Sequence, residues 1–149
     1  MSFKLSERSL DRLKGVDQKL VDVVKRAIDL TEIDFGVTEG LRTLERQQEL
    51  VEKGASQTLK SKHLGGRAVD LVAYIGSRVS WELAVYDDIA EAVRQAANEL
   101  DVTIRWGAAW HKNLTDTKMS AEDLMNEYID LRRSQSRRPF IDAPHFELA

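Results

Sequence analysis

Apolar residues recur with two different periods along this chain, and the period separates its helices from its strands. After Asp17 the apolar positions follow three- and four-residue steps, which places them on one face of a helix. They are Leu20, Val21, Val24, Ala27 and Ile28. The segment 81–100 repeats this spacing at Ile89, Val93, Ala96, Ala97 and Leu100. In contrast, 68–73 is continuously apolar except for one carboxylate, which is typical of a buried strand.

Capping residues and glycines define the remaining elements. Asp17, Thr43 and Ser120 are good N-caps, and Gly15 and Gly54 end the helices before them. The pattern predicts helices over 6–14, from 17 onward, and over 43–52, 81–100 and 120–133. It predicts strands over 35–41, 68–73, 74–79, 102–106 and 145–148. This order predicts an α+β fold, in which a small antiparallel sheet packs against helices within one compact domain, residues 1–149.

Composition narrows the class of protein. The chain has 149 residues, of which 42% are hydrophobic and 32% charged, as in one soluble globular domain. A net charge of -3 argues against a nucleic-acid partner. With no cysteine, any metal must be bound by His, Asp or Glu. No apolar run approaches the roughly 20 residues of a membrane span, and the first residues lack the pattern of a secretory signal.

A basic cluster near the C-terminus consists of Arg132, Arg133, Arg137 and Arg138. Arginine is favourable at the C-terminal end of a helix, so we interpret the cluster as a solvated helix end. The alternative is attraction to an anionic surface, such as a phospholipid or a cell-wall polymer.

Asp70 is the carboxylate inside the apolar run, and burying it is costly unless it is paired or bound to a metal. His63 lies seven residues earlier. In a straight strand the two would be about 23 Å apart, but Gly65 and Gly66 allow a backbone reversal between them. The pair can then supply one nitrogen and one oxygen ligand to zinc. A plain hydrogen-bonded pair is the other interpretation.

The last residues contain a second histidine with a nearby carboxylate, His145 and Asp142. A bend at Ala143–Pro144 is needed to direct both at one centre, because Pro144 disfavours helix and a regular strand separates their directions. His145 then completes a set of two histidines and one carboxylate with a position open for water, and Asp142 is placed to take a proton. Alternatively, Asp142 pairs with Arg137 or Arg138, and spacing alone does not decide between these interpretations.

The segment Ser61-Lys62-His63-Leu64-Gly65-Gly66-Arg67-Ala68-Val69-Asp70 matches the pattern S-x-H-x-x-G-x-A-x-D. With Asp142-x-x-His145, it resembles the zinc D-alanyl-D-alanine carboxypeptidase and dipeptidase group, peptidase family M15. The likeness is closest to phage endolysins of the L-alanyl-D-glutamate peptidase type, which share the Gly40–Thr43 segment and the late His145–Leu148 segment. It spans most of the chain.

This resemblance implies zinc ligands His63, Asp70 and His145, with Asp142 as general base and proton shuttle. It implies that Arg42 polarises the scissile carbonyl, although from sequence alone Arg42 is an ordinary partner for Glu39 or Glu45. Further candidates for contacts with substrate, or for support of the ligands, are Ser61, Gln47 or Gln48, Trp106 and Trp110.

The segment Trp106-Gly107-Ala108-Ala109-Trp110 departs from the Trp-Gly-Gly-Asp-Trp of many relatives, which affects the substrate pocket. Trp106 and Trp110 either line this groove or belong to the core. The third histidine, His111, lies outside both motifs, and we expect it at the surface.

The resemblance predicts a zinc-dependent endolysin that cleaves the L-Ala–D-Glu bond of the peptidoglycan stem peptide. We expect a monomer that is made in the host cytoplasm and reaches the cell wall in the periplasm after holin release, without membrane insertion. The alternatives are a D-Ala-D-Ala carboxypeptidase or dipeptidase, and a catalytically silent, zinc-stapled binding domain. A nuclease fits the ligand types, but the negative net charge disfavours it.

Overall fold

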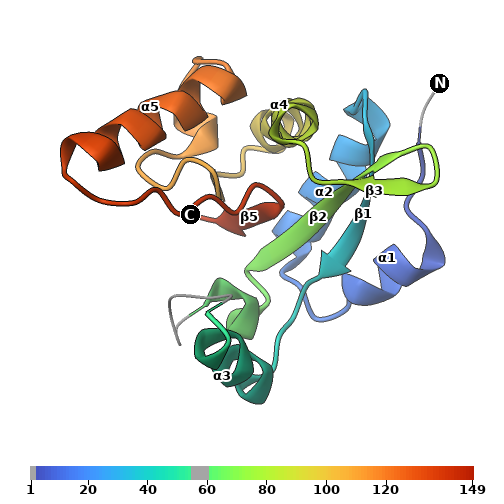
Figure 1. The fold of residues 1–149 in the computed structure, drawn as a ribbon. Helices are drawn as coiled ribbons and strands as arrows, with labels where there is room; N and C mark the ends of the chain where they lie inside the picture. The colour runs from blue at the N-terminus through green and yellow to red at the C-terminus, as the bar shows by residue number, and fades with distance from the viewer. Residues whose placement is uncertain (1–2, 55–60) are drawn as a thin grey trace.

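The fold of this chain was described from a computed structural model, which places residues 3–54 and 61–149. A five-stranded antiparallel sheet lies at the centre, with helices around it (Figure 1). The strands are β1 (Asp34–Glu39), β2 (Ala68–Ile75), β3 (Arg78–Ser80), β4 (Ile104–Trp106) and β5 (His145–Leu148). The helices are α1 (Glu7–Arg12), α2 (Gln18–Leu30), α3 (Leu44–Glu52), α4 (Leu83–Glu99) and α5 (Ala121–Ser134), with 3-10 turns η1 (Lys62–Gly65) and η2 (Leu114–Asp116). The α+β prediction is confirmed.

The predicted caps begin the helices as expected. The side chains of Asp17, Thr43 and Ser120 accept hydrogen bonds from backbone N–H groups in the first turns of α2, α3 and α5. Each bond satisfies one donor that the helix itself leaves unpaired. Residues 62–65 form η1, and 55–60 lie outside the described residues.

Two predicted strands are shorter than expected for local reasons. β1 ends at Glu39 because its pairing with β2 ends at Asp70. β4 begins at Ile104 rather than Val102, because the N–H of Val102 donates to the carbonyl of Ala97 and closes the end of α4. The strand predicted over 68–73 continues to Ile75, and the strand predicted over 74–79 is reduced to Arg78–Ser80, because the turn lies at 76–77 and β3 pairs back on the end of β2.

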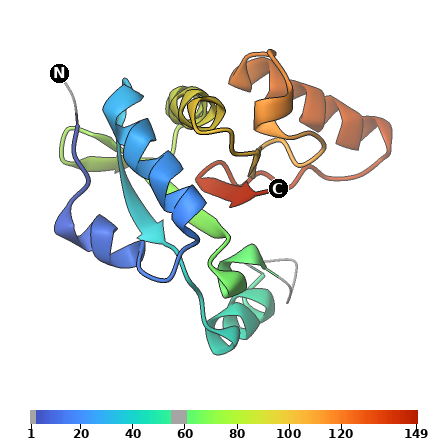
Figure 2. The same cartoon turned by 180° about the vertical axis from the view of Figure 1, so that it is seen from behind.

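The strand order is β1-β2-β5-β4. β5 pairs with residues 68–70 of β2, and β3 pairs with residues 73–75 farther along the same strand. α2 crosses one face of the sheet, as the two opposite views show (Figures 1 and 2). It packs against α4, which in turn contacts α5. Strand alternation directs Val69 and Leu71 to the face opposite Asp70, and both are fully buried in the core. The buried side chains of Val69 and Leu71 thereby fix the part of β2 that carries Asp70.

Candidate active site

His63 is held at the end of the loop before β2. Ser61 caps η1 by accepting a hydrogen bond from the N–H of His63. Gly66 then reverses the chain in the left-handed conformation, with φ of 68°, and a Cβ there would lie 2.3 Å from the carbonyl oxygen of Gly15. The predicted glycine reversal is therefore present, and it brings His63 back beside Asp70.

Sheet register places the other two candidate ligands side by side. Asp70 on β2 pairs directly with His145 on β5, and on the other side with Glu39 on β1. The predicted bend before His145 is present, because the N–H of His145 donates to the carbonyl of Asp142 across Ala143–Pro144 at 3.0 Å. Residues separated by 75 positions in the chain thus become neighbours.

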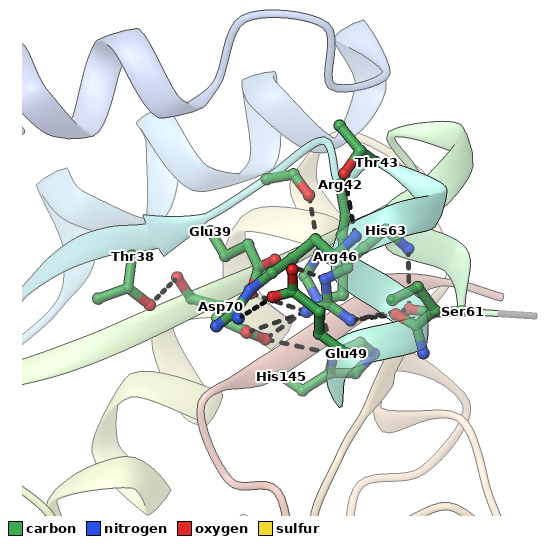
Figure 3. Close-up of polar contacts among 12 residues, drawn as sticks. Thr38, Glu39, Arg42, Thr43, Arg46, Glu49, Ser61, His63, Asp70 and His145 are labelled. Atoms are coloured by element: carbon green, nitrogen blue, oxygen red, sulfur yellow. Dashed lines mark hydrogen bonds and ion pairs between the residues drawn. The ribbon is translucent and has the colours of Figure 1, made fainter. Parts of the chain in front are cut away.

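The side chains of His63, Asp70 and His145 each direct one possible metal-ligating atom at a common centre (Figure 3). Nε2 of His63 lies 3.2 Å from Nδ1 of His145 and 3.3 Å from Oδ1 of Asp70, and the latter two atoms are 3.3 Å apart. Ligand atoms bound at zinc distances in a tetrahedral site lie about 3.3 Å from one another. Among the described residues, this is the one group of three or more His, Cys, Asp or Glu that could hold a metal ion.

Hydrogen bonds on the far side of each ring determine which nitrogen faces the centre. Nδ1 of His63 is 2.8 Å from the carbonyl oxygen of Gly40, which can only accept, so Nε2 keeps its lone pair. Nε2 of His145 is 2.8 Å from Oε1 of Glu147, so its Nδ1 faces the centre. When both rings are neutral, as zinc ligands must be, each of the three atoms that face the centre carries a lone pair, so these residues fit a zinc ion.

The charges of the site shift the pKa values of its members. Burial raises the pKa of Asp70, but hydrogen bonds from His145 and His63 outweigh burial and hold it far below its usual range. Burial lowers the pKa of His145, yet hydrogen bonds to Asp70 and Glu147 raise it to about 9. Burial and repulsion by Asp70 raise the pKa of Asp142 to about 6, against the opposing effects of His145, His63 and Arg42. A carboxyl group with such a pKa suits proton transfer near neutral pH.

Arg42 is buried beside the triad. Its Nε and Nη2 donate to Glu39 at 2.5 and 2.7 Å, and Nη1 donates to Gln47 at 2.5 Å. Nη2 is also 3.9 Å from Oδ2 of Asp70. The pairing with Glu39 that the sequence suggested is present, and this pairing holds the guanidinium next to the candidate metal ligands.

A cleft of about 720 Å³ opens over the triad. One wall comes from β1, α3 and η1, and the other from α5 and the segment that follows it. Its described lining includes all three ligand candidates together with Glu39, Arg42, Ser61, Lys62, Trp110, His111, Tyr128, Arg132, Phe140, Asp142 and Glu147. The candidate ligands, the candidate base and the candidate carbonyl-polarising residue therefore share one cleft.

Comparison with known proteins agrees with this arrangement. The family model described as phage L-alanyl-D-glutamate peptidase matches residues 1–149. The chain belongs to this family.

Two phage relatives carry the same name. An L-alanyl-D-glutamate peptidase of Escherichia phage T5 is 34% identical over 115 residues, which cover 74% of this chain and 84% of the relative. One of Listeria phage A118 is 31% identical over 106 residues, covering 69% of this chain and 37% of that longer protein. The crystal structure of the Serratia marcescens L-Ala D-Glu endopeptidase ChiX matches with a TM-score of 0.74 at 37% identity, covering 98% of this chain and 90% of that one.

The two tryptophans predicted near the substrate have different positions. Trp110 lines the cleft, where its ring lies 5.3 Å from that of His145 and its Nε1 donates to the carbonyl of Phe140. Trp106 is fully buried, stacks on Phe146 and donates to the carbonyl of Ala143. In this family member Trp106 therefore belongs to the core, the alternative that the sequence left open, and it supports the bend before His145.

The segment between the tryptophans contributes to the same bend. The N–H of Gly107 donates to the carbonyl of His145, and the carbonyl of Gly107 accepts from the N–H of Asp142. A Cβ on Gly107 would lie 2.2 Å from the carbonyl oxygen of Asp142. Ala108 and Ala109, the two positions of this segment that depart from the resemblance, are fully buried.

His111 is not the surface residue that we expected. Its side chain is 11% exposed, because the ring stacks on Tyr128 and Nε2 bonds Glu127 at 2.8 Å. Tertiary contact with α5, which sequence spacing does not reveal, buries it in the wall of the cleft.

Glu147 and Lys62 were not singled out from the sequence, although both line the cleft. The alternation His-x-Glu within a predicted strand was a signal for Glu147, because it places both side chains on one face. Ser61 and Gln47, which were candidates, support the site through the N–H of His63 and the guanidinium of Arg42 respectively.

Proposed function

We propose that this chain hydrolyses the L-alanyl–D-glutamate bond in the stem peptide of bacterial peptidoglycan, with zinc held by His63, Asp70 and His145. The observation that carries the proposal is the triangle of the three candidate ligand atoms, 3.2 to 3.3 Å on each side, in a cleft that Asp142 also lines. Membership of the phage L-alanyl-D-glutamate peptidase family supports the choice of bond.

When bound, zinc supplies Lewis-acid chemistry that polarises a carbonyl oxygen and makes water more acidic. Asp142 accepts the proton of the attacking water. Burial and the neighbouring Asp70 raise the pKa of Asp142 above its usual range, which makes its carboxylate a better proton acceptor. The same carboxyl group then gives the proton to the leaving amine of D-glutamate, so one residue completes the transfer.

Arg42 and the cleft walls act on the substrate. The guanidinium of Arg42 stabilises the negative charge that develops on the carbonyl oxygen. Its ion pair with Glu39 orients it before substrate arrives, so little reorganisation is needed during the reaction. Trp110 and Ser61 line the same cleft and contact the stem peptide.

The proposal extends to where the enzyme acts. We propose a single domain over 1–149 that works as a monomer on the cell wall after holin release, with no nucleic-acid partner. Within the part of the chain that the structure describes, no helix is both long and apolar enough to cross a membrane.

Digestion of purified Gram-negative peptidoglycan, followed by mass spectrometry, tests the proposal. The wild type should release peptides that begin with D-glutamate; chelation should abolish this release and added zinc should restore it. The variant Asp142→Asn should lose roughly 10²–10⁴-fold in rate while still binding one zinc. The exposed Asp130→Asn on α5 is the matched control and should keep wild-type activity.

Each other outcome identifies a different function. Release of terminal D-alanine alone would identify a carboxypeptidase with the same metal chemistry. Absence of any cleavage by zinc-loaded protein would favour the zinc-stapled binding domain. An Asp142→Asn variant with wild-type activity would remove Asp142 from the mechanism.

A further inference from the structure

His145 and Glu147 are neighbours on one face of β5. Alternate residues of a strand point to the same side, and here Nε2 of His145 lies 2.8 Å from Oε1 of Glu147. An ionised carboxylate can only accept, so the shared proton belongs to Nε2 and the lone pair of a neutral ring is left on Nδ1. Nδ1 is the atom that faces Asp70 and His63.

Glu147 is itself buried and held by a cation. Its side chain is 8% exposed, and Nζ of Lys62 lies 3.2 Å from Oε2. A buried carboxylate requires such a partner. Lys62 also donates to the carbonyl of Leu148. Because Lys62 directly precedes His63, this ion pair joins the two chain segments that carry the two histidines.

The two histidines differ in what holds them. Nδ1 of His63, on the side of the ring away from the centre, lies 2.8 Å from the neutral backbone carbonyl oxygen of Gly40. The corresponding nitrogen of His145, Nε2, instead contacts the charged carboxylate of Glu147. A carboxylate on the far nitrogen orients the ring and makes its metal-facing nitrogen more basic. The Gly40 carbonyl depends on the backbone alone, whereas the support of His145 can be removed by a single side-chain substitution.

We propose that Glu147 is a positioning residue, which holds the ring of His145 with Nδ1 toward the metal, and that Lys62 holds Glu147 in turn. This inference rests on the proposed function, in that it requires a metal bound by the triad. It assigns no contact with substrate to Glu147.

Zinc affinity tests the role of Glu147 without any assay of activity. Glu147→Gln and Glu147→Leu have similar size, but only Gln keeps an oxygen that can accept from Nε2. The dissociation constant is measured by competition with a chromophoric chelator, at a temperature at which circular dichroism shows each variant folded. Glu147→Leu should bind zinc about 10–100-fold more weakly than the wild type, and Glu147→Gln should recover part of that loss.

The cluster of Glu127, His111 and Lys112 offers a matched control. Glu127 bonds His111 at 2.8 Å and Lys112 at 3.1 Å, so it has the same kinds of partner in the same part of the molecule. His111 is not part of the triad, and Glu127→Leu should keep the zinc affinity of the wild type. A loss in this control equal to that in Glu147→Leu would overturn the proposal.

Nitrogen-15 spectra of the imidazoles in the unmutated, zinc-loaded protein give a second test that needs no variant to fold. His145 should show metal-bound Nδ1 and protonated Nε2, and His63 the reverse. Metal bound to Nε2 of His145, or an unchanged affinity in Glu147→Leu, would overturn the proposal. Zinc binding as expected, without cleavage of the L-Ala–D-Glu bond, would refute the proposed function alone, whereas a wild type that binds no zinc would refute both.

Discussion

The guanidinium of Arg42 is held from several sides at the edge of the cleft. Two of its N–H groups donate hydrogen bonds to Glu39, and a third donates to Gln47. The Arg42 side chain is only 7% exposed. The planar fork of arginine can make these bonds at once, whereas lysine carries the same charge on a flexible stem. Charge alone therefore does not place a cation where the proposed mechanism requires it.

We predict that Arg42→Lys lowers kcat about 10²–10³-fold, as expected for loss of one group that stabilises the oxyanion. Zinc stoichiometry should be unchanged, because Arg42 is not a ligand. Steady-state kinetics on a soluble stem peptide, with metal analysis, measures both. Arg46→Lys is the control, since Arg46 is exposed on α3 and pairs only with Glu49 among the described residues. Wild-type kcat in Arg42→Lys would exclude the proposed role.

The three candidate ligands could be named from the sequence because the two motifs contain them. Their chemistry also follows from the sequence, since an aspartate in an apolar strand requires a partner. What surrounds each ligand was not predictable: the contacts of His63 with Gly40, and of Glu147 with Lys62, join segments far apart in the chain.

At the scale of elements, α4 carries an unfavourable charge. Asp87 lies near the start of this helix, and its Oδ1 is buried without a hydrogen-bond partner among the described residues. Burial, followed by repulsion from Glu122, Asp88 and Glu91, raises its pKa from 3.8 to about 6. Folding therefore opposes ionisation of Asp87.

The sign of the pH dependence follows from this shift. Between about pH 4 and 6 the folded chain binds more protons at Asp87 than the unfolded chain does, so stability falls as the pH rises through this window. Asp87→Asn cannot ionise, and we predict that at pH 7 it raises the free energy of unfolding by on the order of 1 kcal/mol, after allowance for solvent screening. At pH 4 the difference should disappear.

Urea denaturation of the wild type and Asp87→Asn at both pH values measures this effect. Asp130→Asn, at an exposed position on α5, controls for the change in net charge. Equal stabilisation by Asp87→Asn at pH 4 and pH 7 would contradict the assignment.

Local sequence determined most element types, because period and caps act over a few residues. The segment Ser120–Arg133 has a capping serine, two acids in its first turn and arginines in its last, and it forms α5 almost as predicted. The early end of β1 and the late start of β4 depend on strand pairing and on a helix-closing hydrogen bond, which local pattern does not contain.

At the scale of the whole molecule, the metal should link the segments that supply its ligands. One candidate ligand comes from each of three elements, η1, β2 and β5. Zinc that binds the folded chain therefore stabilises it against unfolding. At free zinc one hundred times the dissociation constant, the gain is about 2.7 kcal/mol. For a domain of this size that raises Tm by roughly 5–10 °C.

Thermal unfolding with and without zinc measures this shift, with Asp70→Asn as the comparison. In that variant the zinc-dependent rise in Tm should be strongly reduced, while the metal-free protein stays folded. An identical rise in Asp70→Asn would place the stabilising metal elsewhere in the molecule.

The sequence by itself determined the α+β class, the positions of the helices and strands, and the identity of the three candidate ligands. Those features depend on local periodicity, on capping and on two short motifs, residues 61–70 and 142–145. It also located both reversals, at Gly66 and at Ala143–Pro144, because glycine and proline restrict the backbone in known ways.

Only the tertiary structure decided which side chains meet. The register between β2 and β5 aligns Asp70 with His145, and a shift of one residue would have turned one of them to the opposite face. Packing against Phe146 buried Trp106, and contact with α5 buried His111. Such outcomes depend on the combined packing of distant segments, so no short stretch of the sequence contains them.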